Sequence, residues 1–292
     1  MFKKIFLFEF NSWFNKPAFY IYAVITLGLT MLFMGAAAGA FDGSTSTVSS
    51  LKYVNSPNGL LQVILGLGVY LFLLFPVIIG AAIHKDFKHN VHKVMYSFPF
   101  DKSSYFWGKF LSSVCVSLVL TMFVFIGAYA GTMIPGVNAE MIGPHTLKPY
   151  IDTFLIYIFP GIVLFGSIIF AVVTYSRSVV AGFVVMIAIY VFQGIADSAL
   201  QNNDYETIAA MADPFGITAN IQHTKYWTID EQNNNAIPFT GLIIWNRLLW
   251  TVIGLLILFW SYISFDFKVI PKGWKLFGRR KEPLASVGYQ IA

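Results

Sequence analysis

The chain has 292 residues and a formal net charge of +5, with 57% hydrophobic and only 11% charged residues. Typical globular domains are about 45–50% apolar and about 25% charged, so this composition excludes a water-soluble protein, and its 17% aromatic content excludes a disordered chain. A single cysteine excludes a disulfide scaffold. The composition predicts an integral membrane protein that crosses the bilayer several times.

The first element, residues 1–17, predicts an amphipathic helix lying in the membrane interface. Apolar residues recur at helical spacing, among them Phe2, Phe6 and Phe10, and lysines lie off this stripe. Pro17 then marks the turn into the first membrane span.

Residues 18–267 predict a six-span transmembrane domain that is entirely α-helical. A hydrocarbon core about 30 Å thick requires about 20 apolar residues in a helix. Six continuous apolar stretches reach that length, and none alternates in polarity as barrel strands do. They are about 19–41, 60–83, 110–134, 154–175, 179–199 and 242–265.

The distribution of charge predicts the orientation. Of the 19 Lys and Arg residues, 15 fall on the side that holds both termini, and most acidic residues fall on the other side. Because basic loops stay in the cytoplasm, both termini are expected to be cytoplasmic. The segment 84–109 and the basic tail 268–292 are then cytoplasmic, whereas residues 201–241 form an external loop or cap.

Ionisable residues within the spans are few. Asp197 and Arg247 fall near the outer ends of the fifth and sixth spans and would form a polar pair there. The alternative, which we favour, is that Arg247 only anchors its helix at the membrane interface. The absence of charge at mid-membrane argues against a proton-coupled pump.

Two further patterns have more than one interpretation. Gly35-x-x-x-Gly39 and Gly127-x-x-x-Gly131 permit close helix contact, either within the chain or between subunits. His84, His89 and His92 share one basic stretch, and interleaved lysines favour a solvated surface over a metal site. We therefore expect no bound metal.

Motifs of nucleotide binding and catalysis are absent. The sequence holds no P-loop, no zinc-protease motif and no nucleophile-elbow motif. We expect this chain to be no enzyme and to bind no cofactor. The excess of basic over acidic residues is explained by the orientation of the chain in the membrane and by contact with lipid, so nucleic-acid binding need not be invoked.

Several short motifs lie along the first part of the chain: Phe8-Glu9-Phe10, Lys16-Pro17, the stretch Ala81–Phe87, and Ser97-Phe98-Pro99-Phe100-Asp101-Lys102 followed by Tyr105 and Gly108-Lys109-Phe110. Together they resemble the membrane subunit of an ABC-2-type transporter. Asp213-Pro214-Phe215-Gly216 and Asn246-Arg247-Leu248-Leu249-Trp250 are similar to permeases of Bacteroidetes, some of which continue into a zinc aminopeptidase domain.

This resemblance implies a permease in a bacterial inner membrane that pairs with a second permease subunit and docks a separate ATPase, which binds the ATP and Mg. The ATPase-coupling residues would be Asp86, Phe87, Pro99, Lys102 and Tyr105. Thr26, Thr30, Gln62 and Gln193 would line the substrate path, which suits export of an amphiphile. The alternative is a membrane anchor or scaffold for a peptidase-like component, whereas a secondary transporter lacks support because no inverted repeat is visible.

Overall fold

The computed structural model describes residues 1–41, 52–88, 101–199 and 206–266, and all regular elements in these ranges are helical. They are α1 (Phe2–Phe14), α2 (Pro17–Ala37), α3 (Pro57–Phe72), α4 (Phe75–Lys88), α6 (Lys102–Gly131), η1 (Ala139–Met141), α7 (Lys148–Thr153), η2 (Phe154–Ile158), α8 (Phe159–Ser176), α9 (Val179–Ala199), α10 (Glu206–Ala212), α11 (Ile217–Thr224), α12 (Ile229–Asn234) and α13 (Gly241–Ser264).

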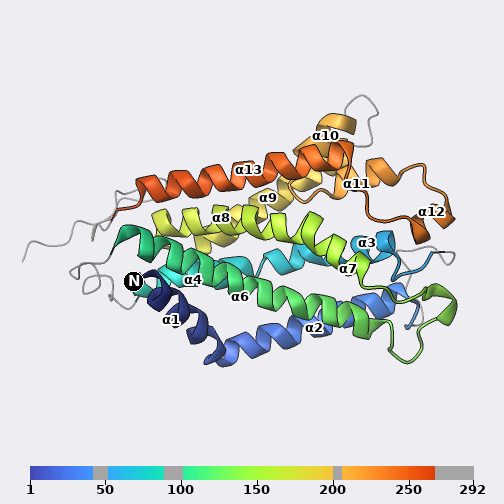
Figure 1. The fold of residues 1–292 in the computed structure, drawn as a ribbon, viewed down its shortest axis with the longest axis horizontal. Coiled ribbons are helices and arrows are strands. Elements are labelled where there is room, and N and C mark those ends of the chain that lie inside the picture. Colours follow the sequence, from blue (N-terminus) through green and yellow to red (C-terminus); the bar gives the residue numbers. More distant parts are fainter. Residues whose placement is uncertain (42–51, 89–100, 200–205, 267–292) are drawn as a thin grey trace, which may run out of the picture.

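Within these ranges, five helical stretches are long and apolar enough to cross a membrane, so the chain is a multi-pass membrane protein. They are Pro17–Ala37, Pro57–Lys88, Lys102–Gly131, Lys148–Ser176 and Gly241–Ser264. The expected fifth span corresponds to α9, in which the described apolar run Val179–Ile195 falls short of this length. Figure 1 shows the long helices side by side, with α1 at one end and α10–α12 at the other; we call these the α1 end and the far end.

Two of the expected spans are interrupted helices, each at a proline. In the second, α3 and α4 are separated by Leu73 and Leu74 just before Pro76. In the fourth, the π-helix η2 precedes Pro160. Proline donates no backbone hydrogen bond and clashes with the preceding turn, which explains why neither stretch is one regular α-helix.

Helix α2 packs closely against α6 through glycines. A Cβ at Gly127 would lie 2.5 Å from the Leu27 carbonyl oxygen, and one at Gly131 would lie 2.6 Å from that of Met31. A Cβ at Gly35 would likewise lie 2.7 Å from Ile134 Cδ1. Of the two interpretations of these glycines, packing within the chain is therefore the one the structure supports, because side chains here would force α2 and α6 apart.

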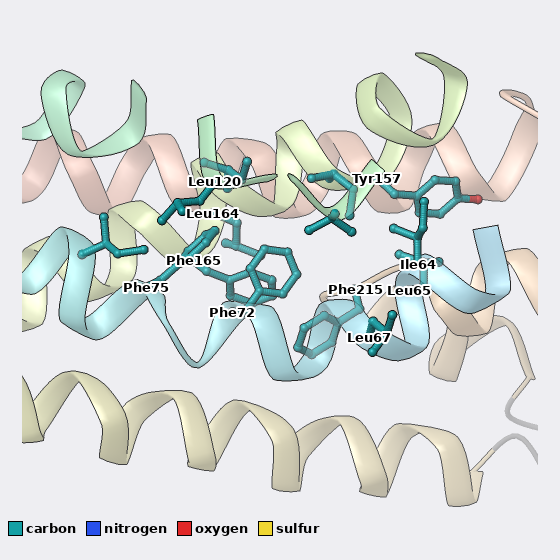
Figure 2. Close-up of a cluster of buried hydrophobic side chains, with 14 of the residues drawn as sticks. Ile64, Leu65, Leu67, Phe72, Phe75, Leu120, Tyr157, Leu164, Phe165 and Phe215 are labelled. Carbon is teal, nitrogen blue, oxygen red and sulfur yellow. The ribbon is translucent and has the colours of Figure 1, made fainter. Parts of the chain in front are cut away.

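The far end folds partly back into the bundle. Phe215, between α10 and α11, is only 3% exposed, and its ring lies 4.8 Å from that of Phe165 and 5.8 Å from that of Phe72 (Figure 2). The Tyr190 ring of α9 also stacks on the Phe215 ring, at 5.6 Å between ring centres. In its described residues, from 206 on, the expected external cap thus contains three short helices, and the loop between the first two inserts an aromatic side chain into the core.

Candidate functional site

A buried cluster of charged side chains joins three helices at the α1 end. The ammonium of Lys109 on α6 lies 2.8 Å from Glu9 Oε1 on α1 and 2.7 Å from Asp86 Oδ2 on α4. Its third donor reaches the Ala82 carbonyl oxygen at 2.7 Å. The Tyr105 hydroxyl donates to Asp86 Oδ2 at 2.7 Å, and Lys85 forms a second ion pair with Glu9. We call these five residues, Glu9, Lys85, Asp86, Tyr105 and Lys109, the charge cluster.

Burial determines the electrostatics of the charge cluster. The Lys109 side chain is 1% exposed, so its charge is tolerable only because all three ammonium donors have partners. Burial alone would raise the pKa of Glu9, but the nearby charges of Lys109 and Lys85 outweigh it and lower that pKa below its usual 4.5. Glu9 therefore carries a negative charge at neutral pH.

The helix ends that flank residues 89–100 are attached to further helices. His84 Nδ1 lies 2.8 Å from the carbonyl oxygen of Arg177, in the turn between α8 and α9. The Arg177 guanidinium lies 4.2 Å from the centre of the Phe87 ring. Lys102 donates to the Ile263 carbonyl oxygen of α13 at 3.0 Å. Both flanking ends are thus held against α8, α9 or α13, in addition to α1.

Asp101 is the N-cap of α6 and determines where that helix starts. Its carboxylate accepts hydrogen bonds from the Ser104 backbone N–H at 3.1 Å and the Ser104 hydroxyl at 3.0 Å. These bonds, the backbone bond above all, lower the pKa of Asp101 from its usual 3.8. This N-cap explains why the helix starts at Lys102.

The expected coupling residues do not form one exposed surface. Asp86 and Tyr105 are buried, so a partner protein could not contact them directly as we expected; they hold α4 to α6 instead. Phe87 is half-buried under Arg177, and Lys102 is half-buried beside Tyr262. Pro99 lies outside the described residues.

Sequence reasoning missed three members of the charge cluster as site residues. Glu9 is the only acid in the apolar stripe of α1, and Lys109 stands at the entry to a span. Lys85 lies beside Asp86 in the same helix. A lone charge among apolar residues near a span end is a usable signal, because such a charge needs a partner when buried.

A second polar cluster, which we call the far-end cluster, joins Asn246, Arg247 and Trp250 of α13 to the end of α10 and the loop Asp213–Gly216. The Arg247 guanidinium on α13 donates to the Pro214 carbonyl oxygen at 3.1 Å, and the Asn246 side-chain amide donates to those of Ala210 at 2.6 Å and Asp213 at 2.8 Å. The Trp250 indole donates to the Met211 carbonyl oxygen at 3.0 Å. One face of α13 thus satisfies carbonyls at the end of α10 and in the following loop.

Asp213 and Gly216 shape that loop. The Asp213 carboxylate accepts from the backbone N–H groups of Phe215 at 2.7 Å and Thr218 at 2.6 Å. Gly216 has a φ of +78°, and a Cβ there would lie 2.6 Å from Arg247 Cζ. Glycine is therefore required both by the backbone conformation and by the close approach of Arg247.

The interpretation of Arg247 as an interface anchor is wrong, because the residue is 5% exposed and hydrogen-bonded to the loop. Its cation also lies 5.7 Å from the Tyr157 ring. Asp197 belongs to α9, but its side chain lies outside the described part of the structure, so the expected pair with Arg247 stays a prediction.

The expected substrate-path residues lie apart. Thr26 and Thr30 line a cavity of about 80 Å³ between α2 and α3, which neither Gln62 nor Gln193 lines. Both threonine hydroxyls donate to carbonyl oxygens of their own helix. Gln62 is exposed on α3 and Gln193 is buried on α9. The structure therefore does not assemble these four residues into one path.

Comparison with family models, curated proteins and solved structures gives no match for this chain. Within the described ranges, no group of three His, Cys, Asp or Glu side chains is placed to hold a metal ion.

Proposed function

We propose that this chain is the membrane subunit of an ABC-2-type transporter, driven by a separate ATPase that docks at the α1 end. The observation that carries the proposal is the attachment of both helix ends flanking residues 89–100. Lys109 and Tyr105 on α6 bind Asp86 on α4, and Glu9 ties α1 to both helices.

This arrangement suits the transmission of force. Helix α6 runs unbroken through its membrane-crossing stretch, and α4 is the part of another such stretch that lies nearest the α1 end. Because a packed interior is stiff, a partner that pushed on the segment between Lys88 and Asp101 would move α4 and α6 together. The contacts of His84 with Arg177, and of Lys102 with Ile263, would spread the displacement to α8, α9 and α13.

Six crossings and a second permease complete the proposal. With α9 as the sixth crossing, α1 and the end of α13 face the same compartment, which we assign to the cytoplasm of a bacterium because Lys and Arg concentrate there. Faces of α2 and α9 leave large apolar side chains exposed, such as Val24, Leu32, Val184 and Val191. These faces are candidates for contact with the second permease.

The cargo would be an amphiphile, because buried side chains between the membrane-crossing helices are mostly apolar with a few hydroxyls. ATP and Mg would be held by the ATPase. The contribution of this chain to transport would then be the movement of its helices.

The test is purification from native membranes in mild detergent, followed by mass spectrometry. We expect an ATPase with a P-loop to copurify. Lys88 is exposed at the α1 end, and Lys88→Glu should reduce the amount of ATPase recovered. Lys225→Glu at the far end is the control and should leave that amount unchanged. Recovery of a peptidase-like component without any ATPase would contradict the proposal and favour a membrane scaffold.

A further inference from the structure

An apolar groove of about 610 Å³ opens on the side of the bundle between α6 and the chain that runs from His145 into η2. The two walls are antiparallel. Tyr129 of α6 meets His145 at 5.2 Å between ring centres near the far end, and Phe125 meets Phe154 at 6.0 Å one turn deeper. The groove therefore runs parallel to α6, so an extended hydrocarbon chain fits along its length.

Polarity changes along the groove. Its deep part is lined by Met122, Ile126 and Leu155, which offer no hydrogen-bonding group except backbone already used in helices. Its outer part holds Tyr129, His145 and Tyr150, and the exposed Lys148 directly follows the lining residue Leu147 in the chain. The groove thus matches a molecule with a hydrocarbon tail and a polar, negatively charged head.

One residue that lines the groove carries an unpaired polar atom. The Tyr150 hydroxyl is buried and has no hydrogen-bond partner among the described residues. A buried hydroxyl normally has a partner, because its desolvation is otherwise uncompensated. An ester or phosphate oxygen of a bound molecule at the outer end would supply one.

The groove also opens toward the surface that lipid covers. Met122, Ile126 and Leu155 are among the exposed large apolar side chains of membrane-crossing stretches. A peptide strand is a poor occupant, because its backbone would lie unsatisfied against the apolar deep part. A volume of this size falls within the range of about 300–1,000 Å³ for small-molecule sites.

We propose that this groove binds a single phospholipid with an anionic head, its acyl chain between α6 and η2 and its phosphate beside Tyr150, His145 and Lys148. The π-helix η2 contributes both to the groove and to the buried interior. It points Leu155 into the groove and buries Tyr157, whose hydroxyl donates to Asn220 Oδ1 at 3.4 Å. π-turns are frequent at functional sites, and this one joins the groove to α11 through the Tyr157–Asn220 contact. The inference does not depend on a transport function.

The test uses the full chain in nanodiscs that contain phosphatidylcholine and a small fraction of phosphatidylglycerol with a photoreactive group in its acyl chain. Labelled peptides are mapped by mass spectrometry. We expect labelling concentrated on α6 and on residues 145–158. Ile126→Trp and Leu155→Trp, both at exposed positions that tolerate a larger side chain, should each fill the groove and reduce this labelling about tenfold, which corresponds to about 1.4 kcal/mol. Leu256→Trp on the exposed face of α13 is the matched control and should leave it unchanged.

The head-group assignment has its own test in the same nanodiscs. Lys148→Gln and Tyr150→Phe should each reduce labelling by the phosphatidylglycerol probe, while leaving unchanged the labelling by a phosphatidylcholine probe that carries the same photoreactive acyl chain. Labelling spread over α2, α9 and α13 in proportion to exposure would overturn the proposal, as would full labelling in both tryptophan variants. Protection of the groove by a second copy of the chain, seen as loss of labelling only in dimers, would overturn it as well.

Discussion

The ammonium of Lys109 lies 2.8 Å from the Glu9 carboxylate, although 100 residues separate them in the chain. This ion pair fixes the N-terminal helix α1 on the membrane-crossing helix α6. Because Lys109 also binds Asp86 of α4, a single cation holds three helices together at the end where we place the ATPase.

Lys109→Met leaves the two carboxylates of Glu9 and Asp86 without their shared cation, and should lower the free energy of unfolding by about 3–5 kcal/mol. Chemical unfolding in a fixed detergent measures it. Lys225→Met is the control, because it breaks an exposed pair with Glu206 and should change stability little. Equal effects of the two substitutions would show that the charge cluster does not hold the helices.

The lowered pKa of Glu9 predicts a pH dependence. Because the carboxylate is favoured in the folded state, its contribution to stability is present above about pH 4.5 and is lost as pH falls through the lower pKa of the folded protein. Thermal unfolding below pH 4.5 should show a steeper loss of stability for the unmodified chain than for Glu9→Gln. Glu140→Gln, at an exposed position, should retain the steep loss; a Glu9→Gln curve of unchanged shape would contradict the assignment.

Gly127→Ala tests the close contact of α2 with α6. The added methyl group would lie 2.5 Å from the Leu27 carbonyl oxygen, and we expect a loss of about 1–3 kcal/mol in unfolding free energy. Gly28→Ala is the same change in the interior of α2, with no atom within 4 Å, and should be neutral or stabilise by up to about 1 kcal/mol. If Gly28→Ala were the more damaging of the two, the face that packs on α6 would be misassigned.

Gly216→Ala tests the far-end cluster. Gly216 and Gly241 both have positive φ, +78° and +52°, so alanine costs about 1–2 kcal/mol at either position. Only at Gly216 would the methyl group also displace the Arg247 guanidinium and break its bond to the Pro214 carbonyl oxygen. Unfolding measurements should therefore rank Gly216→Ala as the more damaging variant, and equal losses would show that Arg247 adds nothing to the loop.

Local patterns explain which features could be predicted from the sequence. Apolar length located five of the six expected membrane-crossing stretches in the described residues. The partners of Glu9 and Arg247 could not be predicted, because they lie 100 and about 33 residues away and depend on how helices pack. The same dependence hid the burial of Asp86 and Tyr105, which sequence reasoning placed on a docking surface.

Cross-linking from Lys88 tests most directly whether the α1 end receives an ATPase. In a Cys115→Ala background, Lys88→Cys and Tyr226→Cys place single thiols at exposed positions at the α1 end and the far end. Native-membrane complexes are treated with a short reagent that joins a thiol to an amine, and adducts are identified by mass spectrometry. We expect an adduct with a P-loop ATPase from Lys88→Cys and none from Tyr226→Cys. No ATPase adduct from Lys88→Cys, or equal adducts from both positions, would contradict the account.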